Sequence, residues 1–308
     1  MLSDTIIYSD RFNAMYKNSI KFCGLTVGLG AFGMFFRWLQ DQAAFEPDTG
    51  LLKPGALNWI VPLAIAVSVF VFFRLIAGLK QKGSAPCTDF YTVFTGESKL
   101  FELISWPVGL LMAVGGVALL IGAKGEPMAG VYSVIAVLAV LSGLGFPLAL
   151  SAPQTRYSPG LVCVLMTFPV VLFTLWVIVS YRIHANVPTV WSYAIEILAI
   201  AAALMGFFLA AGYPYGKARP VPTLFALMLG AYLCIMALGD PGSLSMKLIL
   251  LSAAGMFVMY IWILVLNFYR AEPERTEKPA DDSSPVIEPG EAPDEAPEPT
   301  IQIYDRKK

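Results

Sequence analysis

The sequence predicts an all-α fold, namely a polytopic membrane helix bundle with about eight transmembrane helices and a disordered C-terminal tail. The first observation is composition, because 57% of the 308 residues are hydrophobic and only 14% are charged. A soluble domain carries about 25% charged residues and must present many residues to water. The second is the recurrence of long apolar runs, and the third is an abrupt change to proline and acidic residues after residue 270.

Eight apolar segments have the length that a membrane span requires. A hydrocarbon layer of ~30 Å, at ~1.5 Å of helix rise per residue, needs about 20 residues. The predicted spans are residues 20–36, 57–79, 103–122, 129–150, 160–181, 190–212, 222–239 and 246–268. Together they make up a transmembrane domain over residues 20–270. Residues 1–19 are mixed polar and lack the pattern of a cleavable signal peptide, so we expect a cytoplasmic N-terminal segment there.

Charge is distributed unevenly along the chain. Residues 1–270 hold 16 Lys and Arg against 11 Asp and Glu, whereas residues 271–308 hold 5 against 11. With the N-terminus inside, the short loops place ten basic residues inside and five outside. This bias predicts a multi-pass protein of the cell membrane with both termini in the cytoplasm. The basic residues are too few and scattered to form a nucleic-acid surface, so the expected partner of residues 20–270 is the lipid bilayer.

The C-terminal region, residues 271–308, has a composition typical of disorder. It contains seven prolines and 11 acidic residues, and such a segment cannot bury enough apolar surface to offset the entropy of ordering. We expect a disordered cytoplasmic tail that could recruit a cytoplasmic protein partner. The sequence leaves the oligomeric state open.

Glu196 is the leading candidate for a substrate- or ion-binding residue. It lies about two turns into the sixth predicted span, and a carboxylate in hydrocarbon is costly unless it faces a cavity, a partner or the bundle interior. Ser192 and Tyr193 precede it by four and three residues, so they share its helix face. The alternative is a structural ion pair with Arg182 or His184.

Arg74 is the second charged candidate within a span. It lies near the cytoplasmic end of the second predicted span, so its long side chain can extend to the headgroups. The alternative is binding of a lipid phosphate or a substrate. Arg74 and Glu196 differ in depth by roughly 10 Å at the helical rise per residue, so a direct pair is not expected.

Four local patterns lead to further expectations. Gly28, Gly30 and Gly33 match a dinucleotide fingerprint by spacing, and Gly24 with Gly28 gives G-x-x-x-G, but their position inside a span indicates close helix packing instead. Residues 142–147, with two glycines and a proline, predict a flexible or broken helix. Residues 87–99 are expected to lie along the membrane surface, and residues 37–51 to form the longest outside loop.

The chain lacks the motifs of known enzyme and metal chemistry. It has a single histidine, and no nucleotide-binding, protease or hydrolase motif occurs in a suitable context. No catalytic residue, metal site or cofactor is therefore predicted, and the protein is not expected to be an enzyme. The favoured interpretation is a small-solute or lipid permease, or the membrane subunit of a transporter. The alternative is a non-transporting membrane scaffold or sensor that recruits a partner through its acidic tail.

Overall fold

The computed structural model describes residues 2–43, 55, 57–79, 85–95, 99–124, 128–155, 157–184 and 190–270. Every regular element in these residues is an α-helix, which confirms the predicted fold class. The acidic tail, residues 271–308, lies outside the described residues.

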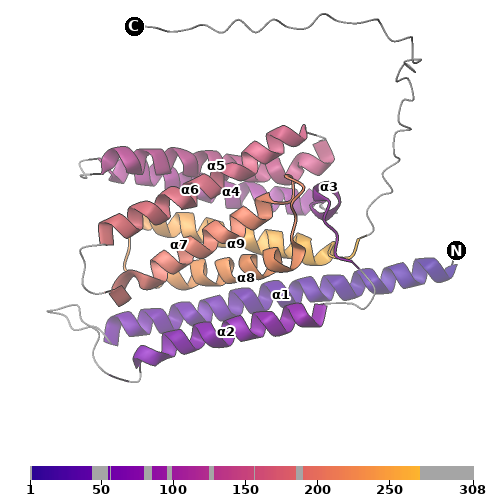
Figure 1. The fold of residues 1–308 in the computed structure, drawn as a ribbon, viewed down its shortest axis with the longest axis horizontal. Helices are drawn as coiled ribbons and strands as arrows, with labels where there is room; N and C mark the ends of the chain where they lie inside the picture. The colour runs from indigo at the N-terminus through magenta and orange to yellow at the C-terminus, as the bar shows by residue number, and fades with distance from the viewer. Residues whose placement is uncertain are drawn as a thin grey trace, which may run out of the picture. The chain divides into compact units, whose positions relative to one another are not determined.

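Nine helices make up the described chain, and eight of them are long and apolar enough to cross a membrane. The exception is α3, a single turn. In chain order they are α1 (Leu2–Ala43), α2 (Leu57–Leu79), α3 (Phe90–Val93), α4 (Lys99–Gly122), α5 (Ala129–Thr155), α6 (Pro159–His184), α7 (Val190–Ala211), α8 (Pro220–Ala237) and α9 (Leu244–Leu266) (Figure 1). The chain is therefore a multi-pass membrane protein.

The first helix is much longer than its predicted span. It begins at Leu2 and ends at Ala43, so the segment expected at residues 1–19 and the start of the expected outside loop belong to one continuous helix. No proline interrupts residues 2–43, so the backbone hydrogen bonds of the helix can continue through its polar ends. As a result Arg37 and Gln40, expected in a loop, lie on the helix with exposed fractions of 1% and 2%.

The centre of the bundle is the pair α8 and α9. In the 18-residue apolar stretch that marks each of these two helices as a span, 72% of the residues are buried, against 22% in the corresponding stretch of α2. Helices α1, α7 and α9 pack against α8, and α1, α4 and α8 pack against α9. In Figure 1, α8 runs between α1 and α7. The helix α2 contacts only α1 and α8 among the more extensive helix pairs, so it lies at the edge of the bundle.

The closest helix contact joins α4 and α5 at two glycines. A Cβ atom on Gly143 would lie 2.4 Å from the carbonyl oxygen of Gly109, and one on Gly109 would lie 2.2 Å from the carbonyl oxygen of Gly143. Only glycine allows backbones to approach so closely. The helix α5 continues through this contact and through Pro147, so the break predicted at residues 142–147 is not present. The glycine there serves packing.

The glycines of α1 divide into two pairs. A Cβ on Gly30 would meet Ile235 at 3.0 Å, and one on Gly33 would meet Tyr232 at 3.2 Å, so these two allow α1 to pack on α8. A Cβ atom on Gly24 or Gly28 would meet nothing within 4 Å. The predicted role in helix packing therefore applies to the second pair within this chain.

Candidate functional site

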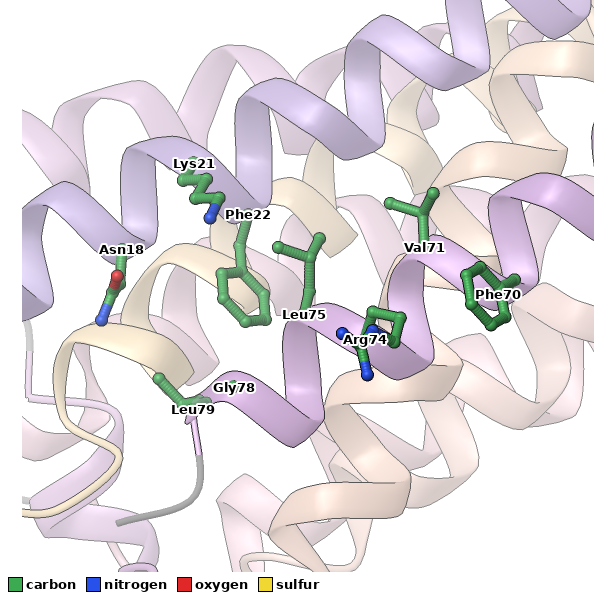
Figure 2. Close-up of a pocket in the computed structure, with 9 residues that line it drawn as sticks. All are labelled: Asn18, Lys21, Phe22, Phe70, Val71, Arg74, Leu75, Gly78 and Leu79. Atoms are coloured by element: carbon green, nitrogen blue, oxygen red, sulfur yellow. The ribbon is translucent and has the colours of Figure 1, made fainter.

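A groove of about 430 Å³ lies between α1 and α2. Asn18, Lys21 and Phe22 of α1 face six residues of α2, and Figure 2 shows Asn18 and Lys21 extending from α1 toward α2. The α2 residues are Phe70, Val71, Arg74, Leu75, Gly78 and Leu79. The groove lies where α2, at the edge of the bundle, borders α1.

Both cations of the groove line it from facing helices. Arg74 precedes the end of α2 at Leu79 by five residues, or about 8 Å at ~1.5 Å of rise per residue. Lys21 lies on α1 and lines the same groove. Both side chains are exposed, and no acidic residue is found among the described residues that line the groove. The groove is therefore an electropositive site within the span region.

Apart from Arg74, the α2 wall of the groove is apolar. Phe70 is 65% exposed, and Val71 and Leu75 are half-buried beside it. Further along α2, Trp59 and Leu63 continue the exposed apolar face. Such a face is suited to contact with lipid chains, so the groove combines two cations with a hydrocarbon-compatible wall.

The other predicted site residues lie on a different helix. Glu196 and Tyr193 are half-buried on α7, whereas Arg74 is on α2, and the described lining of the groove includes no residue of α7. Ser192 also lies on α7, although its side chain is outside the described ones. The structure thus places Arg74 in a pocket whose described lining does not include the Glu196 stripe. A role for Glu196, Ser192 and Tyr193 in binding stays a prediction.

The expected partners of Glu196 lie at the end of α6. Arg182 is exposed there, and the side chain of His184 is outside the described ones. A structural ion pair of Glu196 with either residue therefore also stays a prediction.

A buried polar cluster that the sequence did not single out joins α1 to the turn between α8 and α9. The Arg37 side chain donates from Nε to Oδ1 of Asp240, and from Nη1 to Oε1 of Gln40 at 2.8 Å. Arg37 is 1% exposed and Asp240 is 5% exposed. Charge-assisted hydrogen bonds of this kind compensate two groups that could not be buried separately.

The electrostatic environment of Asp240 is mixed. Burial raises the pKa of its carboxyl, and the Arg37 guanidinium opposes that rise. The negative charge of Asp41 raises the pKa of Asp240 further, and the positive charge of Lys247 lowers it. Oδ2 of Asp240 is buried and has no hydrogen-bond partner among the described residues. The cluster therefore depends on Arg37, which supplies the strongest opposing interaction.

The sequence contained one signal for this pair. The predicted orientation put Arg37 and the Asp240 turn on the same, outer side of the membrane. The contact itself depends on the packing of α1 against α8, and the span pattern does not specify which helices are neighbours.

Residues 87–99 were expected to lie along the membrane surface, but the side chains of Phe90 and Phe94 in this stretch pack into the bundle, while Thr88 stays exposed. Phe90 and Phe94 are buried, with ring centroids 4.9 Å apart. Phe94 also contacts the rings of Tyr213 and Tyr260. Asn267, just after α9, donates from Nδ2 to the carbonyl oxygens of Val93 at 2.7 Å and Thr95 at 3.2 Å.

These contacts explain how irregular backbone is tolerated inside the bundle. The carbonyl groups of Val93 and Thr95 are satisfied by Asn267, and the backbone N–H of Cys87 donates to the carbonyl oxygen of Phe268 at 2.9 Å. Non-helical backbone that is shielded from water requires such protein partners. The aromatic residues, whose pattern indicated a surface segment, instead pack into the end of the bundle where α9 terminates.

Comparison with family models, with curated proteins and with solved structures found no match. The functional assignment of the chain therefore rests on its own residues. Among the described residues, no group of three or more His, Cys, Asp or Glu side chains is placed to hold a metal ion. The groove between α1 and α2 is the candidate site that combines space, charge and access.

Proposed function

We propose that the protein is a permease, or the membrane subunit of a transporter, for an amphiphilic anion that reaches it laterally from the lipid. The observation that carries this proposal is the groove between α1 and α2, where Lys21 and Arg74 lie beside an apolar wall. A cationic site inside a span is costly unless it has a polar partner. An amphiphilic anion would place its charged head beside Lys21 and Arg74 and its apolar body along the apolar wall.

The position of α2 supports lateral entry. This helix is held at the edge of the bundle, and most of its surface is available to lipid. A molecule already dissolved in the bilayer could therefore reach Arg74 without passing between the tightly packed helices α8 and α9. Glu196 on α7 is the second residue assigned to this function, as a carboxylate that could bind a coupling proton or cation.

The test is movement of a labelled lipid across a bilayer that contains the purified full chain. Fluorescent phosphatidylglycerol and fluorescent phosphatidylcholine are incorporated into proteoliposomes, and dithionite quenching reports how much label reaches the outer leaflet. The proposal expects faster movement of the anionic probe than in protein-free vesicles, and slower movement in Arg74→Gln. Equal rates with and without protein for both probes would refute a lipid permease.

A second candidate function is a membrane scaffold or sensor. Two observations favour it: α5 continues unbroken through Pro147, and α8 and α9 form a closely packed centre. Both are expected of a rigid platform. In this case the acidic region 271–308 would recruit the partner. Cross-linking in intact membranes, with the full chain compared with a chain ending at residue 270, should then yield a product that depends on those residues.

A further inference from the structure

The groove between α1 and α2 has the chemistry of a phospholipid headgroup site. We propose that it binds an anionic phospholipid of the surrounding bilayer, with the phosphate between Lys21 and Arg74 and one acyl chain along the apolar wall of α2. This inference deepens the proposed function, on whose site it rests, by naming the ligand class. Binding can nevertheless be measured without transport, so the two can fail separately.

The charges of the groove select an anion. Lys21 lies on α1 and Arg74 on α2, both line the groove, and both side chains are exposed. None of the described lining residues is acidic. The amide of Asn18 lies at the same end of the groove and supplies a neutral donor for a phosphate or glycerol oxygen (Figure 2). Guanidinium and ammonium groups together are the usual protein partners of phosphate oxygens.

The depth of the groove selects a lipid over a solute. Arg74 lies five residues, or about 8 Å at the helical rise per residue, before the end of α2 at Leu79, and Lys21 lines the same groove from α1. A soluble anion would have to leave bulk water to reach them, whereas a lipid phosphate is already anchored at the edge of the hydrocarbon layer. Long basic side chains extend toward that edge, so lipid phosphate and cation can meet without either entering the bilayer centre.

The shape of the groove accommodates an acyl chain as well. Phe22 lines the groove on the α1 side, and Val71 and Leu75 line it on the α2 side. Gly78 leaves space near the headgroup end, because a Cβ atom placed there meets nothing within 4 Å. On the outer side of α2, Phe70 and Phe73 are exposed where lipid chains would lie. A phospholipid therefore finds a polar pocket and a continuous apolar track in the same groove.

The test compares the binding of two lipids to the full chain in detergent. Native mass spectrometry is used to titrate the delipidated protein with phosphatidylglycerol or phosphatidylcholine. The expected result is preferential binding of phosphatidylglycerol by the wild type. Loss of both cations in Lys21→Gln/Arg74→Gln should weaken phosphatidylglycerol binding by roughly 30-fold. Phosphatidylcholine binding should weaken less, because the choline cation already offsets the charge of its phosphate, so the preference between the two lipids should be lost. The matched control, Lys124→Gln/Arg219→Gln, removes two exposed cations outside the groove and should keep the preference.

A second variant tests the groove without altering its charge. Gly78→Leu places a side chain into open space on α2, where it also favours the helix, so folding is preserved. It should reduce phosphatidylglycerol binding by occupying the site. Equal binding of the two lipids by the wild type would overturn the proposal, as would equal losses in the groove and control variants. Displacement of phosphatidylglycerol by millimolar inorganic phosphate would also overturn it, because the site would then accept a free anion.

Discussion

Removal of the Arg37 guanidinium tests whether the buried cluster at the end of α1 holds the bundle together. The change is Arg37→Met, which keeps the length of the side chain and deletes its charge and donors. Arg37 donates to both Asp240 and Gln40, and its exposed fraction is 1%. The variant leaves the Asp240 carboxyl buried with one fewer partner, at a position where Oδ2 already has none among the described residues.

The expected loss of stability is large for a single substitution. Removing one member of a buried ion pair destabilises proteins by about 3–5 kcal/mol, because the remaining charge keeps its desolvation cost. Replacing both members by apolar residues is often close to neutral. The double variant Arg37→Met/Asp240→Leu should therefore recover most of the stability that Arg37→Met loses. This pattern distinguishes an ion pair from two independent packing contacts, whose losses would add.

The loss in Arg37→Met should also depend on pH. Burial already raises the pKa of the Asp240 carboxyl, and without Arg37 nothing of comparable strength opposes that rise. A folded-state pKa above the unfolded value of about 3.9 means that the folded state binds more protons. The stability of the variant should then fall as the pH rises from about 4, until the carboxyl is ionised in the folded state. Each unit of separation between the two pKa values corresponds to about 1.4 kcal/mol.

The assay is unfolding in mixed micelles by titration with sodium dodecyl sulfate, followed by tryptophan fluorescence at several pH values. Lys124→Met is the matched control, since Lys124 is an exposed cation in the turn after α4; its effect should stay within about 0.5 kcal/mol. The reasoning would be refuted if Arg37→Met cost no more than this control. It would equally fail if the double variant lost the sum of the two single losses.

Three further substitutions have defined outcomes. Gly143→Ala places a Cβ against the backbone of α4 and should lower the free energy of unfolding by about 1–3 kcal/mol in the same assay. Gly28→Ala places a Cβ in open space and should be neutral or slightly stabilising. Equal effects of the two variants would contradict the close contact between α4 and α5. Asn267→Ala removes two hydrogen bonds to residues 85–95, and mass-spectrometric hydrogen exchange should show faster exchange there, with unchanged exchange disproving the anchoring. Under the permease proposal, Glu196→Gln should alter the rate of transport or its pH dependence, and a variant with wild-type behaviour would exclude Glu196 from the mechanism.

Much of the membrane architecture was predictable, because a bilayer imposes a strong and local requirement on sequence. Each span must be apolar for about 20 residues and must satisfy its own backbone hydrogen bonds. The eight segments identified from composition and length correspond to the eight long helices of the structure. Boundaries were less well predicted, since polar residues at a helix end do not stop a helix. The residues before position 20 and after position 36 are both part of α1.

The candidate site was predictable only in part. Arg74 was recognised because a charge in an apolar run is conspicuous wherever the helix lies. Lys21 was not linked to it, because nothing in the two segments specifies that α1 and α2 are neighbours or that a groove separates them. The Arg37 and Asp240 pair was missed for the same reason, as was the burial of Phe90 and Phe94 in residues 85–95. Their apolar and aromatic residues are compatible with either a membrane surface or a protein interior.

The sequence by itself determined that this protein is helical, lies in a membrane and crosses it about eight times, because lipid acts on each segment separately. Only the tertiary structure decided which charges meet, which glycines pack and where an opening remains. Helices in a bilayer have no hydrophobic driving force toward particular neighbours, so their partners are chosen by shape and by a few polar contacts. Those contacts involve residues far apart in the chain, such as Arg37 and Asp240, and appear only when the helices are placed side by side.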